Sequence, residues 1–239
     1  KEMTYDVDNR LDTYTQTENN KTTTQSNLYN GNGQRIQKSE GDNTINYYYQ
    51  NGNVLYTTDK DEKKTSHNFV GLEGNTISTM RYNISGLEYY VYNKDVKGST
   101  TNIVDNNKNA KISYKYSDFG ETEEFGDTDF YNEIAYTGGI YDESTSLYYL
   151  NARYYNPEDG RFLTEDTYRG EFTDPSSLHL YAYCTNNPIS YTDPSGHIPV
   201  AVVINAGISA YDGYKYAKKR NIKGVARAGI IVGHVVVGT

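Results

Sequence analysis

One aromatic residue followed by a turn-forming segment recurs along the first 125 residues, and this repeat constrains the fold more than any other feature. Between the turns, polar and apolar residues alternate, as in residues 111–116. Alternation of period two between Asn-Gly turns predicts β-hairpins. A hairpin cannot bury one face alone, so neighbouring hairpins are expected to stack into one continuous sheet. The aromatic residues recur every 20 to 24 positions, at Tyr5, Tyr29, Tyr49, Phe69, Tyr92 and Tyr116.

Tyrosine is the dominant apolar residue, with 27 Tyr against 6 Phe and no Trp. Tyrosine favours strands, and its hydroxyl needs a polar partner when buried. Only 36% of the residues are hydrophobic, which is too few for a thick core. We therefore expect a mainly β chain with a thin, curved sheet whose Tyr and Phe side chains face one concave, buried side. Helix is expected largely in the tail after residue 197.

A second stretch, residues 141–197, carries an ordered set of motifs. These are Ser146-Leu147-Tyr148-Tyr149, Ala152-Arg153-Tyr154-Tyr155, Gly160-Arg161-Phe162-Leu163 and Asp193-Pro194-Ser195-Gly196. The set resembles the repeat-associated core of the Rhs and YD-repeat family, in the form found in Gram-positive wall-associated proteins and polymorphic toxins. The chain is similar to the C-terminal part of such proteins, and we expect a longer polypeptide to precede it.

The resemblance implies a domain organisation as well as a fold. It implies a YD-repeat hairpin array over residues 1–125, whose sheet winds in a spiral and closes into a hollow, teneurin-like shell. The core, residues 126–197, is then a plug in that shell. An apolar and basic pre-toxin tail with short helices follows over residues 198–239. The repeat period by itself also fits a β-solenoid or a sheet without a cavity.

Two aspartates in the core are the candidate catalytic residues. The resemblance implies a self-cleaving aspartyl site made of Asp166 and Asp193, with Arg161 to orient or charge-balance the pair. Two close aspartates share one proton, so that one acts as base and the other as acid. Cleavage is then expected at or just after His197, before Ile198. His197 stands where cleaving members usually have a large apolar residue, and the alternative is that both aspartates cap turns in an inert plug.

Other chemistry is not indicated by the sequence. The single cysteine, Cys184, excludes an intramolecular disulfide and is expected as a small core residue on a strand. The four histidines lack zinc-site spacing. Asp6 and Asp8 resemble the start of a calcium loop but lack its final glutamate, so we interpret them as turn residues. We predict no metal and no cofactor.

The charge is distributed unevenly. Residues 198–239 hold six of the 23 lysines and arginines and one of the 31 acidic residues, so the body is acidic and the tail basic. An acidic body argues against a nucleic-acid partner. The two apolar runs of the tail are shorter than the roughly 18 residues of a membrane-spanning helix. We expect the tail to be held inside the shell, with a membrane-active hairpin as the alternative.

Two functional interpretations follow. The first is a structural encapsulation and delivery module of an exported polymorphic toxin, which is at most a single-turnover aspartyl autoprotease. Its expected partners are a C-terminal toxin cargo or upstream repeats of the same polypeptide, with cell wall, glycan or membrane as further candidates. The second is a cell-surface adhesin or carbohydrate-binding protein, for which aromatic side chains would cluster outward. Both interpretations predict a secreted or cell-surface bacterial protein, of Gram-positive type. A free-standing hydrolase is the weakest interpretation, because nucleophile and metal motifs are missing.

Overall fold

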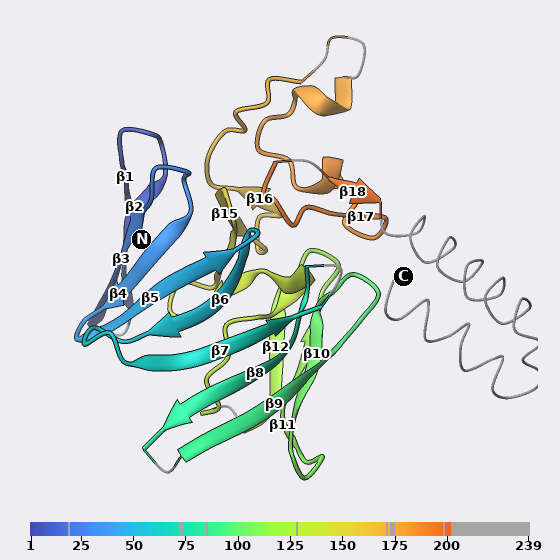
Figure 1. Ribbon diagram of the computed structural model, residues 1–239. Coiled ribbons are helices and arrows are strands. Elements are labelled where there is room, and N and C mark those ends of the chain that lie inside the picture. Colours follow the sequence, from blue (N-terminus) through green and yellow to red (C-terminus); the bar gives the residue numbers. More distant parts are fainter. Residues whose placement is uncertain are drawn as a thin grey trace, which may run out of the picture.

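The computed structural model describes residues 1–201 except Asn19, Leu72, Glu73, Ser85, Thr128, Glu171, Thr173, Asp174 and Ile198. Twelve antiparallel strands form one sheet in strict sequence order (Figure 1). They are β1 (Glu2–Tyr5), β2 (Leu11–Glu18), β3 (Lys21–Tyr29), β4 (Arg35–Glu40), β5 (Asn43–Gln50), β6 (Asn53–Thr58), β7 (Lys64–Val70), β8 (Thr76–Asn83), β9 (Gly86–Lys94), β10 (Thr100–Asp105), β11 (Ala110–Tyr116) and β12 (Thr122–Gly126). The predicted array of consecutive hairpins is confirmed.

Several hairpin turns are closed in the same way by an aspartate or asparagine. Asp6 Oδ1 accepts hydrogen bonds from the backbone N–H groups of Asp8 and Arg10, two and four residues further on. The same pair of bonds recurs at Asn30, Asp59, Asp95 and Asp105. Short side chains of this kind stabilise turns by satisfying backbone donors that the strand ladder leaves free. Asp6 and Asp8 are therefore turn residues, as interpreted from the sequence.

Tyrosines line the inner face of the sheet. Successive side chains of a strand point to opposite faces of the sheet, so every second side chain points inward. Tyrosines at these inward positions are buried. These include Tyr14, Tyr47, Tyr90, Tyr92 and Tyr114. Their hydroxyls find polar partners, as when Tyr14 donates to Gln16. The expectation of a buried aromatic face is confirmed for these residues.

The outer face also carries aromatic side chains, which the sequence interpretation did not assign. Tyr48 and Tyr56 stack with ring centroids 4.3 Å apart and an interplanar angle of 11°. Tyr56 also lies nearly parallel to His67, whose ring is followed by that of Phe69. The four residues come from β5, β6 and β7, where cross-strand neighbours on one face are close enough to touch. We refer to Tyr48, Tyr56, His67 and Phe69 as the outer aromatic row.

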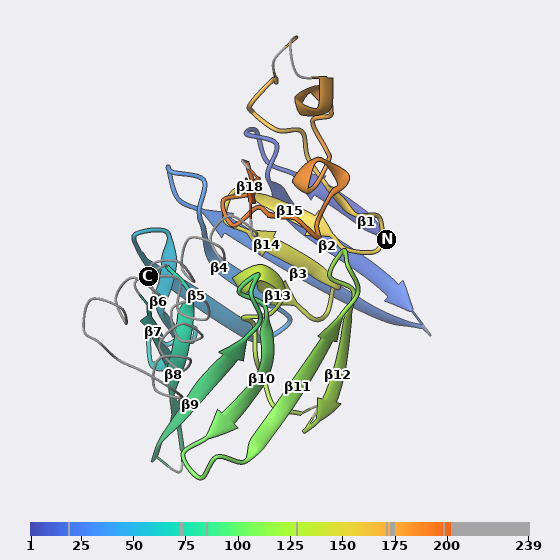
Figure 2. The same cartoon turned by 90° about the vertical axis from the view of Figure 1, so that its right-hand side faces the viewer.

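The following residues form a plug inside the curved sheet. A four-stranded sheet contains β13 (Ile140–Asp142), β14 (Leu147–Leu150), β15 (Arg153–Asn156) and β16 (Arg161–Phe162). Figure 2 shows β13, β14 and β15 against the inner face of the larger sheet. The plug contacts distant strands of that sheet, because Tyr149 accepts a hydrogen bond from the Arg35 N–H and Tyr148 bonds Thr122.

Short turns complete the described chain. Three 3-10 turns, η1 (Tyr136–Gly138), η2 (Pro175–Leu178) and η3 (Cys184–Asn186), connect the plug segments. Cys184 is buried, but it begins η3 with a φ of 49° and is not on a strand as expected. A two-stranded ribbon then pairs β17 (Tyr191–Thr192) with β18 (Val200–Ala201). The helices that we expected over residues 198–239 lie outside the described residues. Of this tail the structure describes only residues 199–201, which contain β18.

Candidate functional site

Two aspartates and one arginine meet where three segments of the plug converge. Asp193 directly follows β17, and Asp166 is fixed by its backbone N–H, which donates to the Leu180 carbonyl at 3.0 Å. Arg153 begins β15 and lies between them. Its Nη2 atom is 2.6 Å from Asp166 Oδ2 and 3.8 Å from Asp193 Oδ2. The structure thus brings Asp166 and Asp193 to one guanidinium, although they are far apart in sequence.

His197 connects the same two carboxylates from the other side. Its backbone N–H donates to Asp193 Oδ1 at 3.0 Å, and its ring atom Nδ1 lies 3.0 Å from Asp166 Oδ1. Ser195 also donates its hydroxyl to Asp193 Oδ1, at 3.1 Å. We refer to Arg153, Asp166, Asp193 and His197 as the aspartate centre. Three of the four side chains are almost fully buried, whereas the side chain of His197 is 36% exposed.

Arg153 is held rigidly in this position. Its Nε–H donates to the Gly196 carbonyl and its Nη1–H to the Leu180 carbonyl. The guanidinium lies 3.6 Å from the centroid of the Phe162 ring, a cation–π contact. Burial lowers the pKa of Arg153, and the two carboxylates oppose that shift. The arginine therefore carries a fixed charge at a fixed position.

Arg161, the arginine chosen from the sequence, does not take this place. Within the described residues it forms no ion pair with Asp166 or Asp193, and its side chain is exposed. The cause is strand alternation: Phe162 points into the core, so its neighbour Arg161 points to solvent. The expectation that Arg161 reaches an aspartate is wrong for this structure.

The two aspartates have different surroundings. Burial raises the pKa of Asp193, while the Ser195 hydroxyl, Arg153 and the N–H of His197 only partly offset it. Asp166 Oδ2 lies 2.6 Å from the Arg153 guanidinium, the distance of a charge-assisted hydrogen bond. Environments that differ in this way assign different roles to two carboxylates. Asp193 is suited to carry the proton and Asp166 to accept one.

A groove of about 680 Å³ lies beside the aspartate centre. The turns β1–β2 and β3–β4 contribute to one wall, including Arg10 and Asn32. The plug contributes Arg153, Asp166 and His197. The aspartate centre is therefore open to a space large enough for a peptide segment.

A buried ionic cluster holds the plug against the sheet. Arg35 on β4 pairs with Asp142 on β13, and both side chains have no exposed surface. Lys38 Nζ lies 3.0 Å from Asp142 Oδ1 and 2.9 Å from Glu133 Oε1. Burial alone would raise the pKa of Asp142, but Arg35 and Lys38 hold it well below its usual range. We name Arg35, Lys38, Glu133 and Asp142 the clasp.

No motif of the sequence pointed to the clasp. Asp142 stands four residues before Ser146, where the first motif of the core begins, and Arg35 and Lys38 stand in an ordinary repeat. The guanidinium of Arg35 also lies 4.9 Å from the ring centroids of Tyr47 and Tyr149. Its aromatic and acidic neighbours come from distant parts of the chain, so only the three-dimensional structure identifies them.

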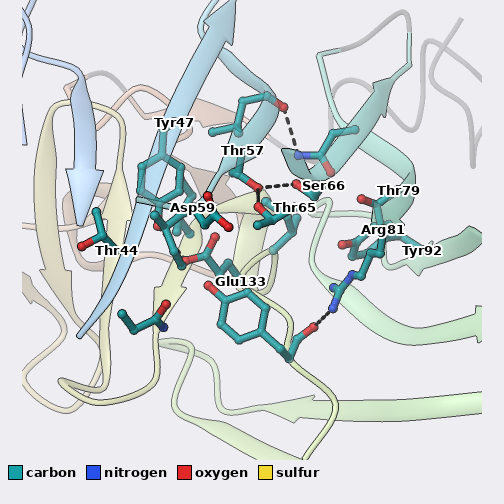
Figure 3. Close-up of a pocket in the computed structure, with 17 residues that line it drawn as sticks. Thr44, Tyr47, Thr57, Asp59, Thr65, Ser66, Thr79, Arg81, Tyr92 and Glu133 are labelled. Carbon is teal, nitrogen blue, oxygen red and sulfur yellow. Dashed lines mark hydrogen bonds between the residues drawn. The ribbon is translucent and has the colours of Figure 1, made fainter. Parts of the chain in front are cut away.

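A smaller cavity of about 250 Å³ lies between the sheet and the plug (Figure 3). Its wall includes a hydroxyl cluster, in which Thr57 Oγ1 bonds both Thr65 and Ser66. Arg81 crosses the cavity wall and donates to the Tyr131 carbonyl. These polar groups already satisfy one another, and Glu133 belongs to the clasp. The polar groups of Thr57, Arg81 and Glu133 in its wall therefore already have partners within the protein.

Among the described residues, no group of three or more His, Cys, Asp or Glu side chains is placed to hold a metal ion. In the same part of the chain, no helix has the length and apolar character needed to cross a bilayer.

A curved sheet of consecutive hairpins with a tyrosine-rich plug defines the class of YD-shell proteins. The family model described as Teneurin YD-shell matches residues 59–189, and the chain belongs to this family. The resemblance to Rhs and YD-repeat proteins is thereby confirmed.

Two relatives with similar sequences are proteins of Bacillus species. The chain is 40% identical over 190 residues to a protein of Bacillus spizizenii named tRNA3(Ser)-specific nuclease WapA, a match that covers 78% of this chain and 8% of that protein. It is 37% identical over 190 residues to tRNA nuclease WapA of Bacillus subtilis, with the same coverage. The chain thus spans less than a tenth of the length of these relatives.

Solved structures share the fold. The crystal structure described as TcdB2-TccC3-Cdc42 matches with a TM-score of 0.64 at 20% identity, over 82% of this chain and 10% of that chain. At this identity the match concerns the fold alone.

Proposed function

We propose that the chain is the closing part of the shell of an exported bacterial toxin, which encloses a C-terminal cargo. The observation that carries this proposal is the plug seated inside the curved sheet and fastened there by the fully buried Arg35–Asp142 pair. Relatives named as WapA nucleases support a toxin of this kind. The nuclease activity in those names is not proposed for residues 1–201.

The alternative of a carbohydrate-binding surface receives less support from the outer aromatic row. Sugars stack on exposed faces of aromatic rings. In the row, Tyr48 and Tyr56 cover one another at an interplanar angle of 11°, and Tyr56 and His67 are parallel within 12°. Part of the ring area of Tyr48 and Tyr56 is therefore used in packing between strands, which explains the row without a ligand.

The aspartate centre supports a single self-cleavage of the backbone after His197. A water oxygen attacks the carbonyl carbon, and Asp166 accepts the proton that this water releases. Asp193 donates its proton to the carbonyl oxygen, which becomes a hydroxyl in the tetrahedral intermediate. The C–N bond then breaks: the hydroxyl returns its proton to Asp193, and the leaving nitrogen takes the proton held by Asp166. Arg153 positions both carboxylates.

The strand pair β17–β18 gives this cleavage a further property. Residues on both sides of the proposed cut pair with each other, Thr192 with Val200 and Tyr191 with Ala201. The new ends therefore stay associated at first, because two paired residues on each side still hold them. Cleavage and release are then separate events.

Mass spectrometry of the intact chain during incubation tests self-cleavage. We expect two products whose masses add up to the full chain plus one water, while Asp166→Asn and Asp193→Asn remain uncut and folded. Asp159→Asn is the matched control, because this aspartate is on an exposed turn of the same plug, where its carboxylate accepts a bond from Asn156. Cleavage of Asp193→Asn at the rate of the unchanged chain would contradict the mechanism.

A further inference from the structure

His197 occupies the carboxylate that the proposed cleavage uses as its base. Asp166 Oδ1 accepts the backbone N–H of Tyr168 at 2.9 Å and lies 3.0 Å from His197 Nδ1. Asp166 Oδ2 is taken by Arg153 at 2.6 Å. A carboxylate oxygen has two lone pairs in the carboxylate plane, so Oδ1 has no lone pair left for a water molecule.

We propose that His197 is a latch on Asp166, which keeps the self-cleavage slow while its imidazole is in place. This inference rests on the proposed function for its consequence, but the contact between His197 and Asp166 does not depend on that function. Water can approach Oδ1 of Asp166, the oxygen that does not face Arg153, only after the imidazole moves away. The partial exposure of the His197 side chain, 36%, gives the ring a path toward the groove.

The latch is sensitive to the charge of the imidazole. An imidazolium donates a charge-assisted hydrogen bond to Asp166, roughly twice as strong as the bond from a neutral ring. The charged groups around the ring are Asp166, Asp193 and Arg153 of the aspartate centre and, along the groove, Asp8, Arg10, Glu165 and Arg169.

Two substitutions separate the latch from the rest of the centre. His197→Leu removes the ring donor but keeps the backbone N–H that binds Asp193. His197→Asn keeps a side-chain donor near the position of Nδ1 and has no charge to gain. We expect His197→Leu to be cut about tenfold faster than the unchanged chain, as for the loss of one hydrogen bond to a charged group. We expect the cleavage rate of His197→Asn to lie between the rates of these two chains.

Nitrogen NMR of the imidazole tests the contact independently of cleavage. An imidazole that donates from Nδ1 to Asp166 is held in the Nδ1–H tautomer when neutral, whereas a free ring prefers the Nε2–H tautomer. We expect the full chain to show Nδ1–H for His197 and Asp166→Ala, which removes the acceptor oxygen, to show the free pattern. The same tautomer in both chains overturns the latch, whatever the cleavage rates.

The cleavage rates then decide between the remaining outcomes. Slower cleavage of His197→Leu than of the unchanged chain also overturns the latch, because His197 would then assist the reaction. If the tautomer follows Asp166 but no chain is ever cut, the hydrogen bond from His197 to Asp166 stands, whereas the proposed self-cleavage and the latch that would slow it both fail. Faster cleavage of His197→Leu, with the tautomer change, supports both. Circular dichroism of each variant confirms that the compared chains are folded.

Discussion

At the scale of single residues, the aspartate centre depends on Arg153. Its guanidinium contacts both carboxylates and two backbone carbonyls, and it lies on the Phe162 ring. A planar, multiply bonded arginine cannot be replaced by a flexible ammonium without loss of position. The site therefore requires the planar shape of the guanidinium as well as its positive charge.

We expect Arg153→Lys to slow self-cleavage by about a hundredfold, because a misplaced catalytic group costs roughly that much. The free energy of unfolding should fall by about 1–3 kcal/mol, since buried acceptors lose their donors. Rates from intact mass and stabilities from urea denaturation check the two effects. Arg161→Lys is the matched control, and an equal loss of cleavage in that exposed variant would contradict the assignment to Arg153.

At the scale of elements, the clasp fixes β13 of the plug to β4 of the sheet. A buried ion pair contributes little net stability compared with apolar residues of the same volume, but removal of one partner is costly. The main effect of the clasp is therefore to fix the position of the four-stranded sheet relative to the twelve-stranded sheet. It places the plug, and hence Arg153 two strands further on, at one position.

We expect Asp142→Asn to lower the free energy of unfolding by about 3–5 kcal/mol, because Arg35 and Lys38 keep buried charge without their partner. The joint change Arg35→Met with Asp142→Leu should cost less than Asp142→Asn alone. Urea denaturation measures both. A joint variant that is less stable than Asp142→Asn would show that the pair itself stabilises the fold.

The clasp also predicts an acid limit of stability. The pKa of Asp142 is lower in the folded chain than in the unfolded chain, where it is about 3.9. Its contribution is therefore complete above about pH 4 and is lost as the pH falls below that value toward the folded pKa. Denaturation curves at decreasing pH should show this loss in the unchanged chain, and the loss should be smaller in Asp142→Asn.

A glycine next to His197 supports the aspartate centre through backbone geometry. Gly196 has a φ of 73°, and a Cβ atom there would overlap the carbonyl oxygen of Leu150. We expect Gly196→Ala to displace the carbonyl that binds Arg153 and to abolish cleavage, while β-sheet content by circular dichroism stays unchanged. Gly31→Ala is the control, because that position has open space and no positive φ. Normal cleavage in Gly196→Ala would contradict this role.

The sequence predicts local features of these elements better than their long-range partners. Strand alternation and turn residues are local, so the hairpins follow from them. The pairing of Asp166 with Asp193 came from a family resemblance and not from spacing. Arg153 was missed because the acceptors and carboxylates that identify it come from distant turns. Arg161 belongs to a motif of the core, which makes it the arginine that the sequence indicates. Its neighbour Phe162 faces the core, so strand alternation directs the side chain of Arg161 to solvent.

At the scale of the whole molecule, the sheet and the plug bury each other's tyrosines. The inner face of the sheet carries Tyr47, Tyr90 and Tyr114, all nearly inaccessible in the complete chain. Each buried aromatic side chain removes about 150–250 Å² from water. A sheet without its plug would expose this area on one side.

We expect residues 1–126 alone to bind a hydrophobic dye such as anilinonaphthalene sulfonate strongly and to associate at micromolar concentration. The complete chain should do neither, because its inner face is covered. Dye fluorescence and light scattering check the prediction, with Asp142→Asn as an intermediate case. A monomeric sheet fragment without dye binding would mean that the inner face is stable without the plug.

The strict sequence order of β1 to β12 also has a consequence for assembly during export. Every strand pairs with the strand made or delivered just before it, so a chain that emerges amino end first never waits for a distant partner. Contacts that are local in sequence form quickly. The plug emerges after β12, when the surface that it must cover already exists. The order of the elements along the chain is therefore also an order in which they can assemble, with the sheet formed before the plug that covers its inner face.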